Sequence, residues 1–198
     1  MNKVILSGLA LCAGLTLSGC TNTIKYDSAP VEQAVVKEVD VNSLQQSTSS
    51  MINAMVESAD VQEATKAKRP VLAVFGLVDF TGEGVDIAAL NNDILNELNK
   101  TARFRFADSG SLSKASQDQN PNLYDLLDSP KAAQPLTQAV SADYLLIGEV
   151  SKVIRTQPTL KETFYRVSLK LVDPKSKDFV WEEKREFLKS QKKIVYGV

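Results

Sequence analysis

The sequence predicts an α/β fold in which helices pack on a mixed sheet of about five strands. First, a continuous apolar run follows Pro70, and a pattern of helical period separates it from a short alternating segment that ends near Ala107. This strand, helix, strand order predicts a βαβ-like unit, whose crossover is nearly always right-handed. Second, the last third of the chain alternates apolar and polar residues between turns, which is typical of a strand meander.

The first twenty residues have the pattern of a bacterial lipoprotein signal. Lys3 is followed by the uncharged apolar stretch Val4–Leu17, which is shorter than the roughly 20 apolar residues that span a bilayer. This stretch leads directly into Leu17–Cys20, which looks like the lipobox of bacterial lipoproteins. We therefore predict that residues 1–19 are a signal peptide and that Cys20 is lipidated. The alternative is a simple secretory signal with an incidental cysteine.

Lipidation would make the chain a membrane-anchored protein. Resemblance to bacterial lipoproteins implies three acyl chains on Cys20, and several chains at ~0.8 kcal/mol per buried CH₂ anchor a protein durably. Thr21 stands where an aspartate would retain a lipoprotein in the inner membrane, so the class rule implies the outer membrane. Residues 20–40 contain Pro30 and little apolar periodicity, which predicts a flexible tether that reaches at most ~65 Å. Residues 41–198 are predicted to form the globular α/β domain.

A helix is expected to open this domain. Apolar residues recur at helical spacing through a segment rich in Ser, Gln and Asn, at Val41, Leu44, Thr48, Met51, Ile52, Met55 and Val56. The favoured interpretation is a helix packed on the domain's own sheet, and the alternative is a groove for a partner. The polar segment Gln62–Arg69 is predicted to be a connection.

The next segments supply the βαβ-like unit. Val71–Val78 is a continuous apolar run, which predicts a central strand covered on both faces. After a loop over Asp79–Val85, Asp86 is predicted to cap a helix. The apolar stripe of that helix is Ile87, Leu90, Ile94, Leu95 and Leu98. Phe104–Ala107 alternates and predicts a short strand nearer an edge.

The remaining segments are predicted to be a long loop, short helical turns and three strands. Asp108–Asn122 is polar and is predicted to be irregular, and Leu123–Val140 holds helical turns interrupted by prolines. Turns at 156–161 and 173–177 then separate a strand that opens at Ala142, a middle strand, and a last strand from about 178 to 189. In the middle strand one face carries Tyr165, Val167, Leu169 and Leu171, and the other carries Phe164, Arg166, Ser168 and Lys170.

The composition excludes several classes of enzyme. The chain contains no histidine, Cys12 lies in the predicted signal, and Cys20 is consumed by lipid. These absences remove Ser-His-Asp and Cys-His catalysis and zinc sites built from His and Cys. Without Lys3 the mature chain carries 22 basic and 24 acidic residues, a balance of −2, which does not suggest nucleic acid as a partner. The sequence predicts no metal, no cofactor and no enzymatic activity.

Four features are weak candidates for function. Thr81–Gly84 lies where a phosphate loop would sit but lacks its lysine and third glycine, so a plain connection is favoured. Glu149 could be a lone catalytic acid, but we expect it to face solvent at the end of the sheet. Glu182–Glu186 is predicted to be a solvated edge, with partner docking as the alternative. Phe164 is the best candidate for an exposed aromatic contact with a partner, unless the helix of residues 41–56 covers it.

Six blocks of the sequence together resemble one protein family. They are Val71–Phe80, Asp86–Leu90, Phe104–Asp108, Ala142–Glu149, Phe164–Asp173 and Phe179–Glu182. In order and spacing they resemble the LpoB family, outer-membrane lipoproteins that activate class A penicillin-binding proteins, and the likeness runs from about Asp40 to Lys189. The resemblance implies a fold like the N-terminal domain of the TolB translocation protein. It also implies a non-enzymatic role, in which the lipoprotein docks on a small non-catalytic domain of the synthase and stimulates glycan polymerisation and crosslinking.

Two positions depart from the family pattern. Asp79 stands where the family usually has asparagine, and Ser141 stands where it usually has glycine. If the backbone at position 141 has a positive φ, the serine is strained there.

Two other classes of function compete with the activator hypothesis. One is an envelope-assembly or secretion lipoprotein of the curli-channel type, which ring-shaped oligomers in electron microscopy would support. The other is a peptidoglycan-cleaving enzyme that uses Glu149, which would release wall fragments until Glu149→Gln stops it.

Overall fold

The computed structural model describes residues 41–193, with side chains from Leu44 onward. The predicted signal peptide, Cys20 and the predicted tether lie outside these residues. The helices are α1 (Val41–Glu57), α2 (Ala59–Lys66), α3 (Ile87–Thr101), α4 (Ser109–Gln119), α5 (Leu123–Asp128), the 3₁₀ helix η1 (Pro130–Ala133) and α6 (Gln134–Ala139). The strands are β1 (Val71–Phe80), β2 (Arg105–Phe106), β3 (Tyr144–Gln157), β4 (Leu160–Asp173) and β5 (Asp178–Lys193).

The strands of the described residues form one mixed sheet, so the predicted fold class is confirmed. The strand order is β2-β1-β3-β4-β5. β1 pairs in parallel with both β2 and β3, whereas β3, β4 and β5 form an antiparallel meander. The parallel pairing of β1 and β2 around α3 is the predicted strand, helix, strand unit.

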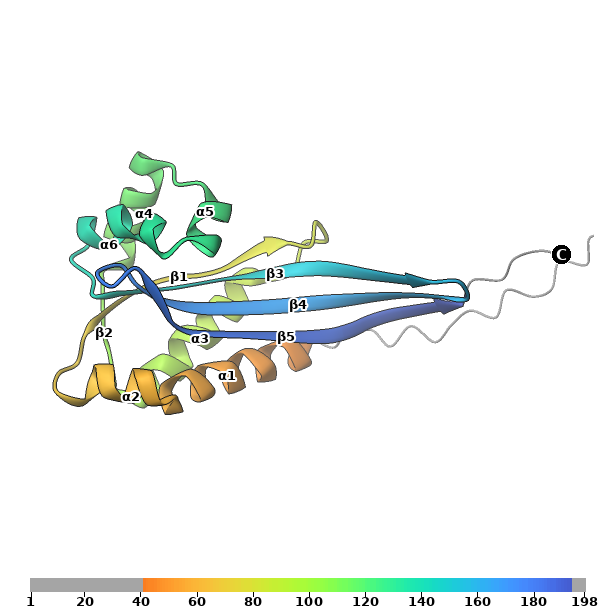
Figure 1. The fold of residues 1–198 in the computed structure, drawn as a ribbon, viewed down its shortest axis with the longest axis horizontal. Helices are drawn as coiled ribbons and strands as arrows, with labels where there is room; N and C mark the ends of the chain where they lie inside the picture. Colours follow the sequence, from red (N-terminus) through yellow and green to blue (C-terminus); the bar gives the residue numbers. More distant parts are fainter. Residues whose placement is uncertain (1–40, 194–198) are drawn as a thin grey trace, which may run out of the picture. The chain divides into compact units, whose positions relative to one another are not determined.

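Helices cover both faces of the sheet near its β1 end (Figure 1). On one face α1, α2 and α3 bury a cluster that includes Met51, Ile52, Leu90, Ile94 and Leu169. On the other face α4, α5, η1 and α6 pack against β1 and β3. The predicted stripe of α1 is confirmed from Leu44 to Val56, because all six of its described members are buried. The same strand β1 contributes to both clusters, which confirms that it is covered on both faces.

The register of β1 against β3 shifts by one residue, and a side chain of α3 forms hydrogen bonds with the backbone of β1 next to the shift. The shift lies between Val74 and Gly76. Gly76 has a φ of +83°, and a Cβ atom built there would lie 2.5 Å from the Asn91 Oδ1 atom. The Leu77 amide donates to that oxygen at 2.7 Å, and the Asn91 Nδ2 atom donates to the Leu77 carbonyl at 3.3 Å. A glycine is therefore required at position 76 both for its φ and for this close approach.

Three strands continue beyond β1 and beyond the helices (Figure 1). The β1–β3 pairing ends at Phe80 opposite Ser151, but β3, β4 and β5 remain paired up to a two-residue turn at 158–159. We call residues 152–157, 160–165 and 187–193 the three-stranded extension. A bulge at Lys189 shifts the register of β5 within it, between the pairs Phe164–Leu188 and Thr163–Ser190.

Several predictions of irregular structure are wrong. Residues 62–69 are mostly helix α2, which buries Val61 and Thr65. Residues 108–122 contain helix α4, whose cap Asp108 accepts a hydrogen bond from the Ser111 amide at 2.7 Å. The turn at 156–161 is shorter than predicted, and strands β1 and β5 run on to Phe80 and Lys193. Each of these segments contains few apolar residues, so the apolar pattern alone does not reveal its helix or strand.

Other local predictions are confirmed. Asp86 caps α3 by accepting from the Ala89 amide at 3.0 Å. Ser141 has a φ of +52° just after α6, where the Ala142 amide closes the helix end on the Thr137 carbonyl at 2.8 Å. A serine therefore occupies a left-handed position that favours glycine. Among residues 41–193, no helix has the length and apolar character that crossing a membrane requires.

Candidate partner-binding surface

An apolar row crosses the three-stranded extension. Val153, Phe164 and Leu188 lie directly opposite one another on β3, β4 and β5. Phe164 and Val153 are half-buried, and Leu188 is 37% exposed. We call these three residues the Phe164 row. The row lies on the sheet face opposite Tyr165, which packs in the α1 cluster, so the alternative that α1 covers Phe164 is wrong.

A charged network borders the Phe164 row. The Arg155 guanidinium lies 4.4 Å from the centre of the Phe164 ring. Glu186 accepts hydrogen bonds from the Arg166 Nε and Nη2 atoms at 3.0 and 2.6 Å, and a further one from Arg155. The hydrogen bonds from Arg166 and Arg155 hold the pKa of the Glu186 carboxyl below its usual range. The network therefore joins all three strands beside an apolar patch, which is the arrangement of an interface centre with a polar rim.

The other face of the extension holds a basic hollow of about 230 Å³. Glu83, from the loop between β1 and α3, lies within it and forms an ion pair with the Lys152 Nζ atom at 3.1 Å. Glu83 also binds the Lys189 ammonium and accepts a hydrogen bond from the Tyr165 hydroxyl. We call this site the lysine hollow. Its lining residues are Glu83, Lys152, Ile154, Lys161, Thr163, Lys189, Ser190 and Lys192.

Asp79 shapes the loop that carries Glu83. Its carboxylate accepts hydrogen bonds from the Thr81 amide at 2.7 Å, from the Thr81 hydroxyl at 2.6 Å and from the Val85 amide at 3.3 Å. Burial raises the pKa of the Asp79 carboxyl, but the hydrogen bonds from Thr81, Val85 and Gly84 outweigh it, so the pKa lies below its usual range. Two amides that a phosphate loop would present are thus bound to Asp79, which favours the plain connection.

Glu149 does not lie at the end of the sheet, so that expectation is wrong. It lies within β3, paired with Val78 on one side and Ser168 on the other, and it is half-buried. Its carboxylate accepts a long hydrogen bond from the Ser151 hydroxyl at 3.4 Å. Within residues 41–193, no three Asp, Glu, Cys or His side chains gather closely enough to hold a metal ion.

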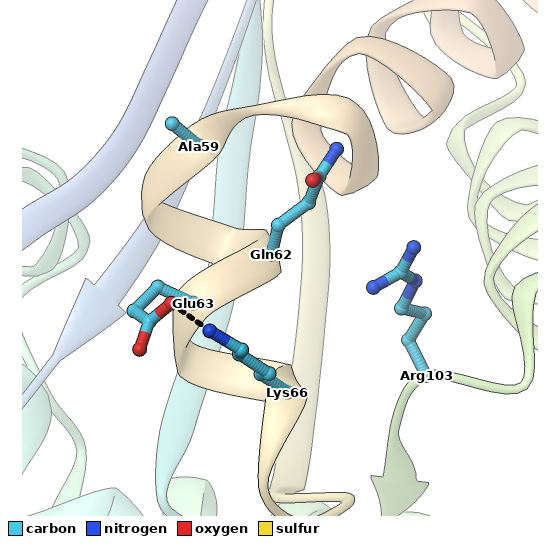
Figure 2. A pocket seen from close by; sticks show the side chains of 5 residues that line it. All are labelled: Ala59, Gln62, Glu63, Lys66 and Arg103. Carbon is cyan, nitrogen blue, oxygen red and sulfur yellow. Dashed lines mark hydrogen bonds and ion pairs between the residues drawn. The ribbon is translucent and has the colours of Figure 1, made fainter.

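A larger hollow of about 380 Å³ lies beside α2 (Figure 2). In Figure 2, Glu63 and Lys66 pair with each other along the helix, and Arg103 comes from the segment on the opposite side. The Lys66 and Glu63 side chains are about three-quarters exposed. Arg103 donates to the Thr65 hydroxyl at 3.4 Å. These groups engage one another at the surface and do not converge on a shared point, so we do not assign a site there.

Sequence reasoning identified Phe164 but missed other exposed apolar residues. Val153 and Leu188 were not singled out, because their place beside Phe164 depends on a register that the sequence does not give. Tyr124 on α5 is 62% exposed, and its ring lies 4.9 Å from that of Phe80. The sequence does not single it out, because the apolar residues around it fit one helical turn, and this pattern does not show which of them is exposed. The charged segment 182–186 lies on β5, which is one of the two edge strands of the sheet, as predicted.

Comparison with known proteins identifies the family. Two solved structures share the fold: the LpoB C-terminal domain from Escherichia coli, with 18% identity and a TM-score of 0.53, and that from Salmonella enterica, with 16% identity and a TM-score of 0.52. Each likeness covers 73% of this chain and 97% of the other. Comparison with curated protein sequences gives no match. A sequence model described as "Peptidoglycan-synthase activator LpoB" matches residues 43–187. The chain therefore belongs to the LpoB family.

Proposed function

We propose that this chain is a non-enzymatic, lipid-anchored protein of the outer membrane that binds a class A penicillin-binding protein and activates peptidoglycan synthesis. Membership of a family of peptidoglycan-synthase activators carries this proposal. The lipobox-like sequence Leu17–Cys20 and the absence of histidine from the sequence support it, because they favour a tethered binding protein over a catalyst.

Activation without catalysis needs only a difference in affinity. If the chain binds the active conformation of the synthase more tightly than the inactive one, binding shifts the synthase toward the active conformation. A tenfold stimulation corresponds to about 1.4 kcal/mol of coupling between the two proteins. One compact docking surface can supply a coupling energy of this size.

The Phe164 row is the docking surface that we propose for the synthase. Its three apolar side chains come from three different strands, so hydrogen bonding between the strands holds them in place before binding. Pre-ordered side chains lose little entropy on association, and an aromatic residue within a polar rim is typical of interface residues that dominate affinity. The Arg155–Glu186–Arg166 network supplies that rim.

Binding and activation can be tested with purified components. The mature chain with Cys20→Ser, which cannot be lipidated, should bind a purified class A penicillin-binding protein and raise its rate of glycan polymerisation. Failure to bind and an unchanged rate would together refute the proposed function.

A matched pair of variants tests the docking surface. Phe164→Ala should weaken binding by about 2 kcal/mol, or roughly 30-fold, because it removes the centre of the row. Tyr124→Ala removes a more exposed aromatic ring from α5 and should leave binding unchanged. If Tyr124→Ala weakens binding and Phe164→Ala does not, the docking surface lies on the helical side of the molecule.

The proposed location has its own test. Lipid on Cys20 would be shown by incorporation of labelled palmitate that stops in Cys20→Ser. Thr21→Asp should move the lipoprotein to the inner membrane and abolish its function in cells, because the anchor would then be on the wrong side of the wall. Full function from the inner membrane would show that reach from the outer membrane is not required.

A further inference from the structure

We propose that the lysine hollow binds an acidic peptide segment of a protein partner, as a second contact on the face opposite the Phe164 row. The identity of that partner rests on the proposed function, but the chemistry of the hollow does not. Its ligand class follows from a lining that contains four lysines and a single carboxylate.

Two of the lysines already bind a carboxylate from within the chain. Glu83 pairs with Lys152 and Lys189, and all three side chains are about 30% exposed. The loop held by Asp79 brings Glu83 into the hollow from outside the three-stranded extension. Glu83 therefore shows which group these lysines accept, and it occupies part of the site that a ligand would use.

The other two lysines face each other without compensation from the described residues. Lys161 on β4 and Lys192 on β5 are direct cross-strand neighbours, and both are exposed. Within residues 41–193, neither of them forms an ion pair. Like charges directly opposite on neighbouring strands destabilise a sheet, and a bound carboxylate would relieve this repulsion.

The lining also fits a peptide. Ile154, which is 49% exposed, adds an apolar side chain, and Thr163 and Ser190 add hydroxyl groups that can donate to a carboxylate. A volume of about 230 Å³ accommodates one or two acidic side chains. The hollow and the Phe164 row lie back to back on the same strands, so a partner that grips the extension from both faces would contact both.

Hexaglutamate labelled with a fluorophore is the probe, and fluorescence anisotropy with the Cys20→Ser mature chain is the measurement. We expect binding that weakens as salt is added, because salt screens exposed charges. Lys161→Glu with Lys192→Glu should weaken binding by about tenfold, and the neutral pair Lys161→Gln with Lys192→Gln should weaken it by less. Glu83→Gln should strengthen binding several-fold, because it frees Lys152 and Lys189.

The control variant carries the same net charge as the Lys161→Glu, Lys192→Glu variant. Lys114→Glu with Lys131→Glu changes two exposed lysines on the helical side by the same four charge units, and it should alter the affinity less than twofold. Circular dichroism and thermal melting check that each variant folds.

Absence of hexaglutamate binding, an equal loss in the control variant, or weaker binding by Glu83→Gln would overturn the proposal. A different result would assign the hollow to the cell wall instead. In that case the chain would bind isolated peptidoglycan but not hexaglutamate, and the Lys161 and Lys192 changes would abolish the binding of peptidoglycan. The probe contains no synthase, so this result and the test of activation succeed or fail separately.

Discussion

The sheet has two parts that share strands but differ in their surroundings. Near β1, helices cover both faces, and β4 is buried at almost every position from Tyr165 to Val172. In the three-stranded extension, the same strand is half-buried or exposed from Leu160 to Phe164. Continuous hydrogen bonding joins the two parts. The difference indicates that the covered part supplies stability, while the extension presents side chains held in fixed positions.

The largest expected effect comes from a matched pair on β3. Leu146 is fully buried between helices, so Leu146→Ala should lower the free energy of unfolding by about 3 kcal/mol. Ile154, eight residues further along, is 49% exposed, and Ile154→Ala should change it by less than about 0.5 kcal/mol. Urea denaturation measures both values. Equal losses would mean that the extension also carries a core.

The next effect concerns the attachment of α3 to β1. Asn91→Ala leaves the Leu77 amide without its acceptor and should cost about 2 kcal/mol of unfolding free energy. Asn92 lies next to it in the same helix and is exposed, so Asn92→Ala should have almost no effect. Similar melting temperatures for the two variants would show that the bulge does not need its side-chain partner.

A smaller effect of opposite sign is expected at Ser141, just after α6. Ser141→Gly should raise the free energy of unfolding by about 0.5–1 kcal/mol, because glycine accepts the positive φ at no steric cost. Ser113→Gly, on an exposed turn of α4, should lower it by a similar amount. Denaturation of the two variants side by side gives both signs, and loss of stability in Ser141→Gly would contradict the assigned strain.

The smallest expected effect is a pH dependence of the free energy of unfolding, which we compare at two carboxyl groups, those of Asp143 and Glu186. The hydrogen bond from Lys175 and that from the Val71 amide hold the pKa of Asp143 below its usual range. A lowered folded-state pKa means that the stabilisation is complete above the unfolded value of about 3.9 and is lost as the pH falls through the folded value. The stability difference between wild type and Asp143→Asn should therefore shrink below about pH 4.

Glu186 in the network beside the extension provides the comparison. Its pKa is also lowered, but its donors are all side chains, from Arg166 and Arg155, whereas Asp143 also accepts from the Val71 backbone amide at 3.0 Å. Glu186→Gln should thus show a weaker change of stability over the same pH range, and added salt should reduce it further. If the pH-dependent change in stability is larger at Glu186 than at Asp143, the network beside the extension contributes more to stability than its exposure suggests.

The covered part of the sheet could be predicted from the sequence, because burial leaves a periodic apolar pattern. The α1 stripe, the apolar run of β1 and the alternation of β4 all gave correct elements. Helices α2 and α4 were missed because each buries two residues, such as Leu112 and Ala115 in α4, within a polar segment. Two buried residues do not establish a period.

The candidate surfaces could be predicted only in part. Phe164 was found because an aromatic residue on a polar strand face is visible in the sequence. Its neighbours Val153 and Leu188, and the meeting of Lys161 with Lys192, depend on registers and on the bulge at Lys189. Glu83 enters the lysine hollow from a loop about 70 residues before Lys152, a contact that no local pattern encodes.

The side chain of Asn91 also bears on the order in which the chain assembles. It lies 14 positions after Leu77, whereas the β3 partners of β1 lie about 70 positions further along. Closing the shorter loop costs less entropy, so the β1–α3 hairpin can form early and already hold the backbone kink. When β3 pairs with β1 later, the backbone of β1 around Gly76 is already fixed. This disfavours pairing of β3 in a register that is wrong by one residue.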